Sequence, residues 1–351
     1  MCVLLSLVLR ELRYKSTFYG SGTIWFRRRH VLPSYMTWKR RPSCSVALVA
    51  FVLFHVQGVV QAQIPGADTV QHAGVSQPLP SNIRSCRAIT AAVSGGLMLG
   101  TYVALDQAWY AQYERSRFHT FDDSGEWLQM DKAGHFFSAY TLGTWGHAAW
   151  SRCGTSEREA LLVGGSLGFI FLAGVEVLDG TSAAWGFSWS DMAANTAGTG
   201  LFMGQQALWK EQRIAVKLSA HLTPFAEQRP DLLGQGLSER ILKDYNGQTF
   251  WLSANLRSFQ KESKIPAWLN VAVGYGGENM LSAFPNPMGT RDGDQSHFRQ
   301  FFLSPDIDLT RIKVRSKLLR TVLFVLNGIK VPLPALEIRS NGRVLAHGLY
   351  F

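Results

Sequence analysis

The chain has 351 residues, of which 46% are hydrophobic and 17% are charged. Soluble globular chains carry roughly 25% charged residues, so this composition excludes a disordered chain and favours contact with a membrane. The net charge is +10, but residues 1–45 hold nine of the 35 Lys and Arg and one of the 25 Asp and Glu. The rest of the chain is close to neutral, so charge gives no support for a nucleic-acid partner.

Residues 1–62 have the pattern of an export signal. Two basic triplets precede an uncharged apolar run, 46–60, which is shorter than the roughly 20 residues of a membrane span. The small side chains around Gln61 predict signal-peptidase cleavage after Ala62, and the alternative is an uncleaved N-terminal anchor. Met36 is a second candidate start, because a chain beginning there has a signal of ordinary length.

The cysteines bear on lipid attachment and on cross-linking. No cysteine stands at the predicted cleavage point, so the sequence does not predict a lipid anchor there. The chain after cleavage contains Cys86 and Cys153, which allow a single intramolecular pairing in an oxidising compartment. The sequence leaves open whether that bridge forms.

Residues 63–86 predict a linker, and residues 87–215 predict a helical bundle. Four helix-length stretches in this region contain no Asp, Glu, Lys or Arg: 88–105, 133–150, 160–175 and 192–209. Three of them contain a Gly-x-x-x-Gly pair: Gly96/Gly100, Gly164/Gly168 and Gly200/Gly204. Such pairs let helix backbones touch, which is typical of packing in lipid. The predicted fold is mainly α, a Gly-rich four-helix membrane-embedded or membrane-apposed bundle followed by a β-rich C-terminal region.

Residues 216–351 form that β-rich region. Three stretches rich in β-branched and aromatic residues predict strands: 249–256, 267–274 and 300–309. The pair Asn246-Gly247 predicts a hairpin turn, because both central positions of a type I′ turn need positive φ. Residues 311–329 combine five basic side chains with an apolar run, which suits either an anionic membrane surface or a solvated basic strand edge.

Polar residues gather at the ends of the uncharged stretches. The candidate site residues are Asp131, Lys132, His135, Glu176, Asp179, Ser188, Asp191 and Asn195. A short hairpin between the second and third helices places Asp131 beside Glu176, and the turn from Asp179 to Trp189 returns the chain to the same end. We therefore expect these residues to converge, with Ser188 as the N-cap of the fourth helix.

Three chemical roles are open for this polar cluster. The first is a structural hydrogen-bond network between helices, the second is a ligand or metal site, and the third is a catalytic pair of base and orienting acid. The candidate metal ligands are Asp131, His135, Glu176 and Asp191, because oxygen and imidazole ligands suit divalent cations. No catalytic residue and no cofactor follows from the sequence.

The motifs resemble those of the YfiM-like family of bacterial envelope proteins. The resemblance is carried by 131–136, 176–180, 185–188 with Asp191, and 195–198, and it extends over about residues 87–280. The polar residues are also similar, more distantly, to those of VanZ-like membrane proteins. The resemblance implies an exported protein with a helical core. Members of the YfiM-like family are commonly predicted lipoproteins, so the absence of a cysteine after the signal departs from the family pattern.

The sequence thus favours a membrane-associated protein of the bacterial cell envelope that binds a lipid or a cell-wall-related ligand at the polar cluster. A metal-dependent hydrolase of a lipid-linked phosphate and a soluble periplasmic structural module are the alternatives. The expected partners are membrane lipids or another envelope component, and nucleic acid is not expected. Whether the chain is an enzyme stays open.

Overall fold

A computed structural model describes residues 81–111, 113–285 and 296–351. The predicted export signal and most of the predicted linker lie outside the described residues. The longer helices are α3 (Ser81–Leu105), α4 (Met130–Ser151), α6 (Leu167–Gly180), α7 (Trp189–Trp209) and α12 (Lys317–Leu326). Short helices are α5 (Glu157–Glu159), α8 (Phe225–Gln228), α9 (Pro230–Leu233), α10 (Leu237–Lys243) and α11 (Leu256–Phe259). Single 3-10 or π turns are η1 (Asp106–Tyr110), η2 (Glu126–Gln129), η3 (Ala160–Gly164), η4 (Tyr245–Gly247) and η5 (Leu309–Arg311).

The C-terminal region contains a six-stranded antiparallel sheet in which each strand pairs with the next along the chain. Its strands are β1 (Ile214–Ala220), β2 (Gln248–Asn255), β3 (Leu269–Glu278), β4 (Phe298–Ile307), β5 (Leu333–Arg339) and β6 (Val344–Tyr350). β2, β3 and β4 confirm the three strands predicted from the sequence.

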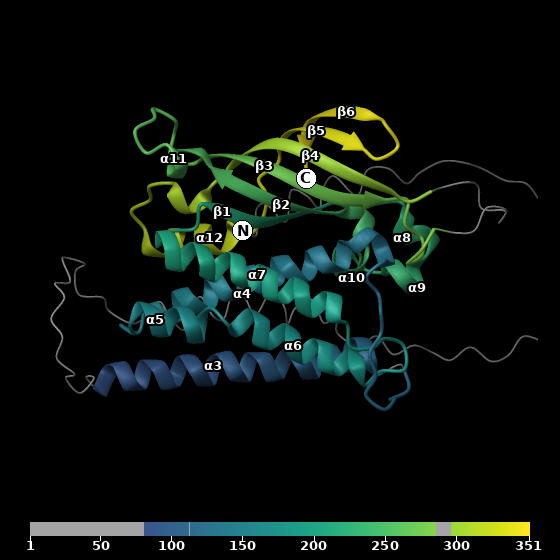
Figure 1. The fold of residues 1–351 in the computed structure, drawn as a ribbon, viewed down its shortest axis with the longest axis horizontal. Helices are drawn as coiled ribbons and strands as arrows, with labels where there is room; N and C mark the ends of the chain where they lie inside the picture. The colour runs from purple at the N-terminus through teal and green to yellow at the C-terminus, as the bar shows by residue number, and fades with distance from the viewer. Residues whose placement is uncertain (1–80, 112, 286–295) are drawn as a thin grey trace, which may run out of the picture. The chain divides into compact units, whose positions relative to one another are not determined.

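The sheet curls, so that one of its faces becomes an interior. Tyr350 on β6 hydrogen-bonds Thr249 on β2 at 2.9 Å, although β2 and β6 are not neighbours in the sheet. The enclosed face packs Trp251 and Phe302 against Tyr350. It also buries the ion pair of Lys217 with Asp306. Figure 1 shows β5 and β6 folded over the strands that precede them.

The helices pack on the opposite face of the sheet. α4 contacts α6, α7, β1 and β2, and it is the central helix of the structure (Figure 1). Tyr140 of α4, Phe202 of α7 and Val216 of β1 form one buried cluster. A second buried cluster joins Met130 at the start of α4 to Phe250 of β2. The uncovered part of this sheet face is apolar as well, with Val273 and Leu303 about half exposed.

The predicted four-helix membrane bundle is wrong. Among the described residues, two segments, Asn82–Leu105 and Glu157–Gly180, are long and apolar enough to cross a membrane, by length and composition only. After Lys132, α4 lacks charges because α6, α7 and the sheet surround it, whereas α7 is partly exposed, with Trp189 and Leu208 at 70% and 77%. The fold is an assembly of helices packed on a curled antiparallel sheet.

Two local features also bear on the sequence analysis. The structure contains a disulfide between Cys86 of α3 and Cys153, which follows α4, with Cα atoms 5.5 Å apart. The hairpin predicted at Asn246-Gly247 is wrong. These residues form the 3-10 turn η4, in which the side-chain amide of Asn246 is buried and donates to Asp244 and to the carbonyl of Met280.

Candidate functional site

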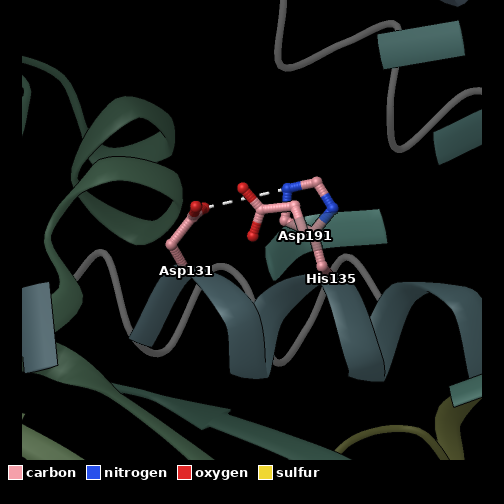
Figure 2. A group of neighbouring side chains, drawn as sticks. All are labelled: Asp131, His135 and Asp191. Carbon is pink, nitrogen blue, oxygen red and sulfur yellow. Dashed lines mark ion pairs between the residues drawn. The ribbon is translucent and has the colours of Figure 1, made fainter. Parts of the chain in front are cut away.

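The polar cluster forms where three helix ends meet. The start of α4 supplies Asp131, Lys132 and His135, the end of α6 supplies Glu176, and the start of α7 supplies Asp191 and Asn195. Figure 2 shows the carboxylates of Asp131 and Asp191 beside the imidazole of His135. The site therefore joins side chains that lie far apart in the sequence.

Close helix contacts hold these ends together. A Cβ on Gly198 of α7 would collide with the carbonyl oxygen of Phe136, and one on Gly168 of α6 would collide with that of Ala139. Both contacted carbonyls belong to α4, one and four residues after His135. Backbone contact at these points is what lets side chains from three helices reach one another.

An unusual left-handed turn sets the start of α4. Trp127, Leu128 and Gln129 have φ of 48°, 53° and 63°, a conformation that costs roughly 1–2 kcal/mol for each non-Gly residue. The carbonyl oxygen of Leu128 accepts hydrogen bonds from Tyr275 and from Arg299 Nη1, so the sheet stabilises the turn. The turn thereby fixes where α4 begins and where Asp131 lies.

Lys132 is the cationic centre of the cluster. Its Nζ lies 2.6 Å from Asp123 Oδ2 and 3.1 Å from a carboxylate oxygen of both Asp131 and Asp191. Burial alone would lower the pKa of Lys132, but Asp131 and the other carboxylates outweigh it and raise that pKa. For Asp123 the effect of burial is the reverse, since it would raise the pKa. Hydrogen bonds from Lys132 and Ser188 instead lower the pKa of Asp123 to about 2.

His135 divides its two nitrogens between different partners. Nδ1 lies 3.0 Å from Oδ1 of Asn195, whereas Nε2 lies 3.6 Å from Oε1 of Glu176 and 3.9 Å from Oδ1 of Asp131. Burial would lower the pKa of His135, but the surrounding carboxylates, Asp131 first, raise it. Nε2 of His135 therefore lies among the carboxylates, in a position to bind either a proton or a cation.

The most deeply buried acids of the cluster carry raised pKa values. Glu176 is 1% exposed, and burial raises its pKa to about 8. Its Oε2 accepts a hydrogen bond from the backbone N–H of Ser188 at 3.0 Å. Its Oε1 accepts none from the described residues and is directed toward His135. Burial and the charge of Asp131 also raise the pKa of Asp191.

Three of these side chains have the geometry of a metal site. One ligand atom each from Asp131, His135 and Asp191 lies within 4.8 Å of the other two. Two carboxylates and an imidazole are a ligand set that suits Mn²⁺, Fe²⁺ or Zn²⁺. Glu176, the fourth metal candidate of the sequence, lies next to the set through its contact with His135 Nε2.

The other candidate residues lie at the margin of the cluster. Ser188 is the N-cap of α7, as predicted, because its Oγ accepts from the N–H of Asp191. Asp179 accepts from the hydroxyl of Tyr110 at 2.8 Å, and burial raises its pKa to about 6. The structure thus brings all eight candidate residues to one end of the helices, and their chemical role stays a prediction.

The sequence analysis did not name Asp123 or Tyr245, which both contact the cluster. Asp123 precedes α4 and accepts from Ser188 and Ser190 besides pairing with Lys132. Tyr245 of η4 donates to Oδ1 of Asp131 at 2.9 Å. Asp123 stands in the loop before α4, outside any helical spacing, and Tyr245 comes from a distant part of the chain.

The comparisons with known proteins identify one family. Residues 120–204 match the sequence family described as a predicted periplasmic lipoprotein (DUF2279). All eight candidate residues and Asp123 fall within the match, and Tyr245 lies beyond it. No curated protein and no solved structure matches the chain. The match confirms the expected location: the protein is an exported protein of the bacterial cell envelope.

Proposed function

We propose that this envelope protein binds a divalent cation at the polar cluster and, through the cation, a phosphate-bearing lipid or cell-wall component. The observation that carries the proposal is the arrangement of His135. Because Asn195 Oδ1 accepts from Nδ1, the neutral imidazole has its lone pair on Nε2, which faces Asp131 and Glu176. A hydrogen bond of this kind to the distal nitrogen is typical of a metal-ligating histidine.

The charge of the cluster supports a cation. Four carboxyl groups, those of Asp123, Asp131, Glu176 and Asp191, surround one ammonium group and one imidazole. Even with a charged imidazole, four ionised carboxyl groups would leave an excess of negative charge in a largely buried place. Unpaired buried charge costs several kcal/mol per ion. A divalent cation would offset that excess.

Glu176 supplies an independent argument. Its side chain is 1% exposed, and Oε1 has no hydrogen-bond donor among the described residues. A buried carboxyl oxygen without a hydrogen-bond partner costs roughly 1–3 kcal/mol. A cation held by His135 and the two aspartates would give this oxygen a partner, either directly or through a bound water.

The ligand of the cation is expected at the more open side of the cluster. Asp131 is the most exposed of the three candidate ligands, with 30% of its side chain accessible. A divalent cation with three protein ligands keeps coordination positions for water or for an anionic oxygen. Phosphate groups are the anions that lipids and lipid-linked cell-wall precursors present, and Lys132 lies beside this position.

Metal analysis of the purified protein tests the proposal. We expect about one equivalent of Mn²⁺, Fe²⁺ or Zn²⁺ by elemental analysis, and a lower melting temperature after chelation, because a ligand that binds only the folded state stabilises it. Asp191→Asn and His135→Gln should abolish the bound metal. Asp231→Asn, at an aspartate that is 72% exposed, is the matched control and should retain it.

Two other results would contradict the proposal or change the assigned function. A protein that binds none of the three metals, and whose melting temperature does not change on chelation, would contradict the proposal and leave the cluster as a structural network. Release of phosphate from a lipid-linked phosphate by the metal-loaded protein, lost in Asp191→Asn, would instead establish the hydrolase.

A further inference from the structure

The chain between β4 and β5 carries an unbalanced positive charge. Residues 308–332, which join the two strands, contain six Lys and Arg and one acid, Asp308. Two of the six have partners: Arg311 pairs with Asp308, and Lys330 is buried facing Asp306. The other four lie at the surface, and none of them forms an ion pair with a described residue: Lys313, Arg315, Lys317 and Arg320. Electrostatic balance within the described chain therefore does not explain these four cations.

Exposed leucines lie among the cations. Leu318 and Leu319, in the first turn of α12, are 55% and 44% exposed. A single exposed leucine needs no explanation, but an adjacent pair enclosed by four cations is a recurring feature of surfaces that bind anionic membranes. We call the surface formed by Lys313, Arg315, Lys317, Leu318, Leu319 and Arg320 the basic surface.

The position of the cations on α12 is unfavourable for the isolated protein. Ser316 caps the N-terminus of α12, and Lys317 and Arg320 follow in its first turn. Positive charge at a helix N-terminus opposes the helix dipole and costs roughly 0.3–1 kcal/mol per charge. An anionic partner at this end of the helix would offset that cost.

The far end of α12 is attached to the body of the protein. The side chain of Asn327 accepts from the N–H of Leu309 at 2.8 Å. The backbone on either side of Ile329 pairs with Leu218 of β1, at 2.9 Å in both directions. Four residues of the basic surface, Lys317 to Arg320, thus lie on a helix whose C-terminal end is fixed to the edge of the sheet, so the fold sets the orientation of these residues.

We propose that the basic surface docks on an anionic phospholipid bilayer. The charge complementarity, the exposed leucine pair and the location in the cell envelope support this partner. Each Lys or Arg near an anionic membrane contributes about 1 kcal/mol, and the leucines add apolar burial at the level of the headgroups. None of the residues of the basic surface belongs to the polar cluster, so this proposal does not depend on the cation site.

Vesicle co-sedimentation tests the proposal on the exported chain, in chelator so that no divalent cation bridges protein and lipid. The vesicles contain either phosphatidylcholine alone or an equimolar mixture with phosphatidylglycerol. We expect binding to the mixed vesicles that weakens with added salt, and little binding to the neutral ones. Neutralising Lys313, Arg315, Lys317 and Arg320 with Gln should lower the partition coefficient by about fivefold per charge.

The control removes the same number of charges elsewhere. Arg84, Arg117, Arg158 and Arg343 are exposed, lie in other parts of the chain and match the tested set in number of charges. Their replacement by Gln should leave binding within about twofold, since membrane attraction falls off within a Debye length of the surface. Leu318→Ser with Leu319→Ser should weaken binding while leaving its salt dependence unchanged.

Several outcomes would overturn the proposal: equal binding to both kinds of vesicle, no binding to either, or equal loss in the control variant. Strong binding to polyglutamate that the leucine substitutions do not affect would also overturn it and indicate an acidic protein partner. Asp191→Asn should leave vesicle binding unchanged, so failure of this proposal and failure of the cation site are distinguished.

Discussion

Asp179 shows how burial at the edge of the polar cluster affects stability at the scale of a single residue. Burial raises its pKa from 3.8 to about 6, although the hydrogen bond from Tyr110 acts in the opposite direction. The folded state therefore binds the proton more tightly than the unfolded state. The resulting stabilisation is complete below the unfolded pKa and is lost as the pH rises through the folded pKa.

Asp179→Asn is expected to stabilise the protein at about pH 8 and to leave it unchanged near pH 3.5. The amide is never charged, so it avoids the cost of ionising a buried carboxyl group, which a shift of this size puts at about 1–3 kcal/mol. Denaturant unfolding followed by circular dichroism at the two pH values measures the difference. Asp231→Asn is the exposed control, and an equal gain in that variant would contradict the assignment to Asp179.

The site could be predicted from sequence to the extent that helical spacing determines it. Asp131 and His135 are four residues apart, as are Asp191 and Asn195, so each pair lies on one face of its helix. Short connections then bring the helix ends together. Asp123 and Tyr245 could not be found in this way, because their positions depend on a loop and on the packing of η4 beside α4.

At the scale of elements, helix α7 contains glycines with opposite roles. A Cβ on Gly198 would collide with the carbonyl oxygen of Phe136 on α4. A Cβ on Gly200 or Gly204 of the same helix would meet no neighbouring atom within 4 Å. Gly198 is required for the close approach of α7 to α4, whereas the other two glycines make no such contact.

Gly198→Ala should therefore separate α7 from α4 and lower the free energy of unfolding by about 1–3 kcal/mol. It should also reduce cation binding, because Asp191 and Asn195 move with α7. Gly200→Ala and Gly204→Ala in the same helix are the controls, and they should raise stability by up to about 1 kcal/mol each through helix propensity. Thermal unfolding of the three variants checks the prediction, and equal destabilisation of all three would contradict it.

The elements themselves were predicted more successfully than their surroundings. The uncharged stretches predicted helices where α3, α4, α6 and α7 lie, in an order that the structure retains. Absence of charge does not tell which material covers a helix, because other elements surround α4 whereas α3 leaves Ile89, Leu99 and Val103 exposed. This is why the membrane bundle is wrong. Of the three Gly-x-x-x-Gly pairs, Gly164/Gly168 lies at a helix contact, while the other two have open space beside them.

At the scale of the whole molecule, the sheet places its polar side chains inside and many apolar ones outside. Lys217 is fully buried, and its Nζ lies 2.7 Å from Oδ2 of Asp306, which is also fully buried. Lys330 lies 3.8 Å from the other oxygen of Asp306 and packs on the ring of Trp251. One acid thus faces two lysines within the curl of the sheet. The β-branched and aromatic composition predicted the strands but could not tell which face of the sheet would be enclosed.

Asp306→Asn should destabilise the protein by about 3–5 kcal/mol, because it leaves two buried lysines without a counter-charge. Adding Lys217→Met should recover part of that loss, since the double variant removes one of the uncompensated charges. Denaturant unfolding of both single variants and the double variant gives the coupling between the two residues. Additive losses would show that Lys217 and Asp306 do not stabilise one another.

The disulfide between Cys86 and Cys153 has a consequence for when the protein completes its folding. It closes a loop across a sequence separation of 67 residues, and chain entropy puts the stabilisation from such a loop at about 4 kcal/mol. The bond forms only where thiols are oxidised, which for an exported protein means after it has left the cytoplasm. Before that crossing, α3 is not covalently held to the end of α4, and the chain lacks this part of its stability. The chain therefore reaches its most stable state only after the disulfide has formed in the compartment where the protein works.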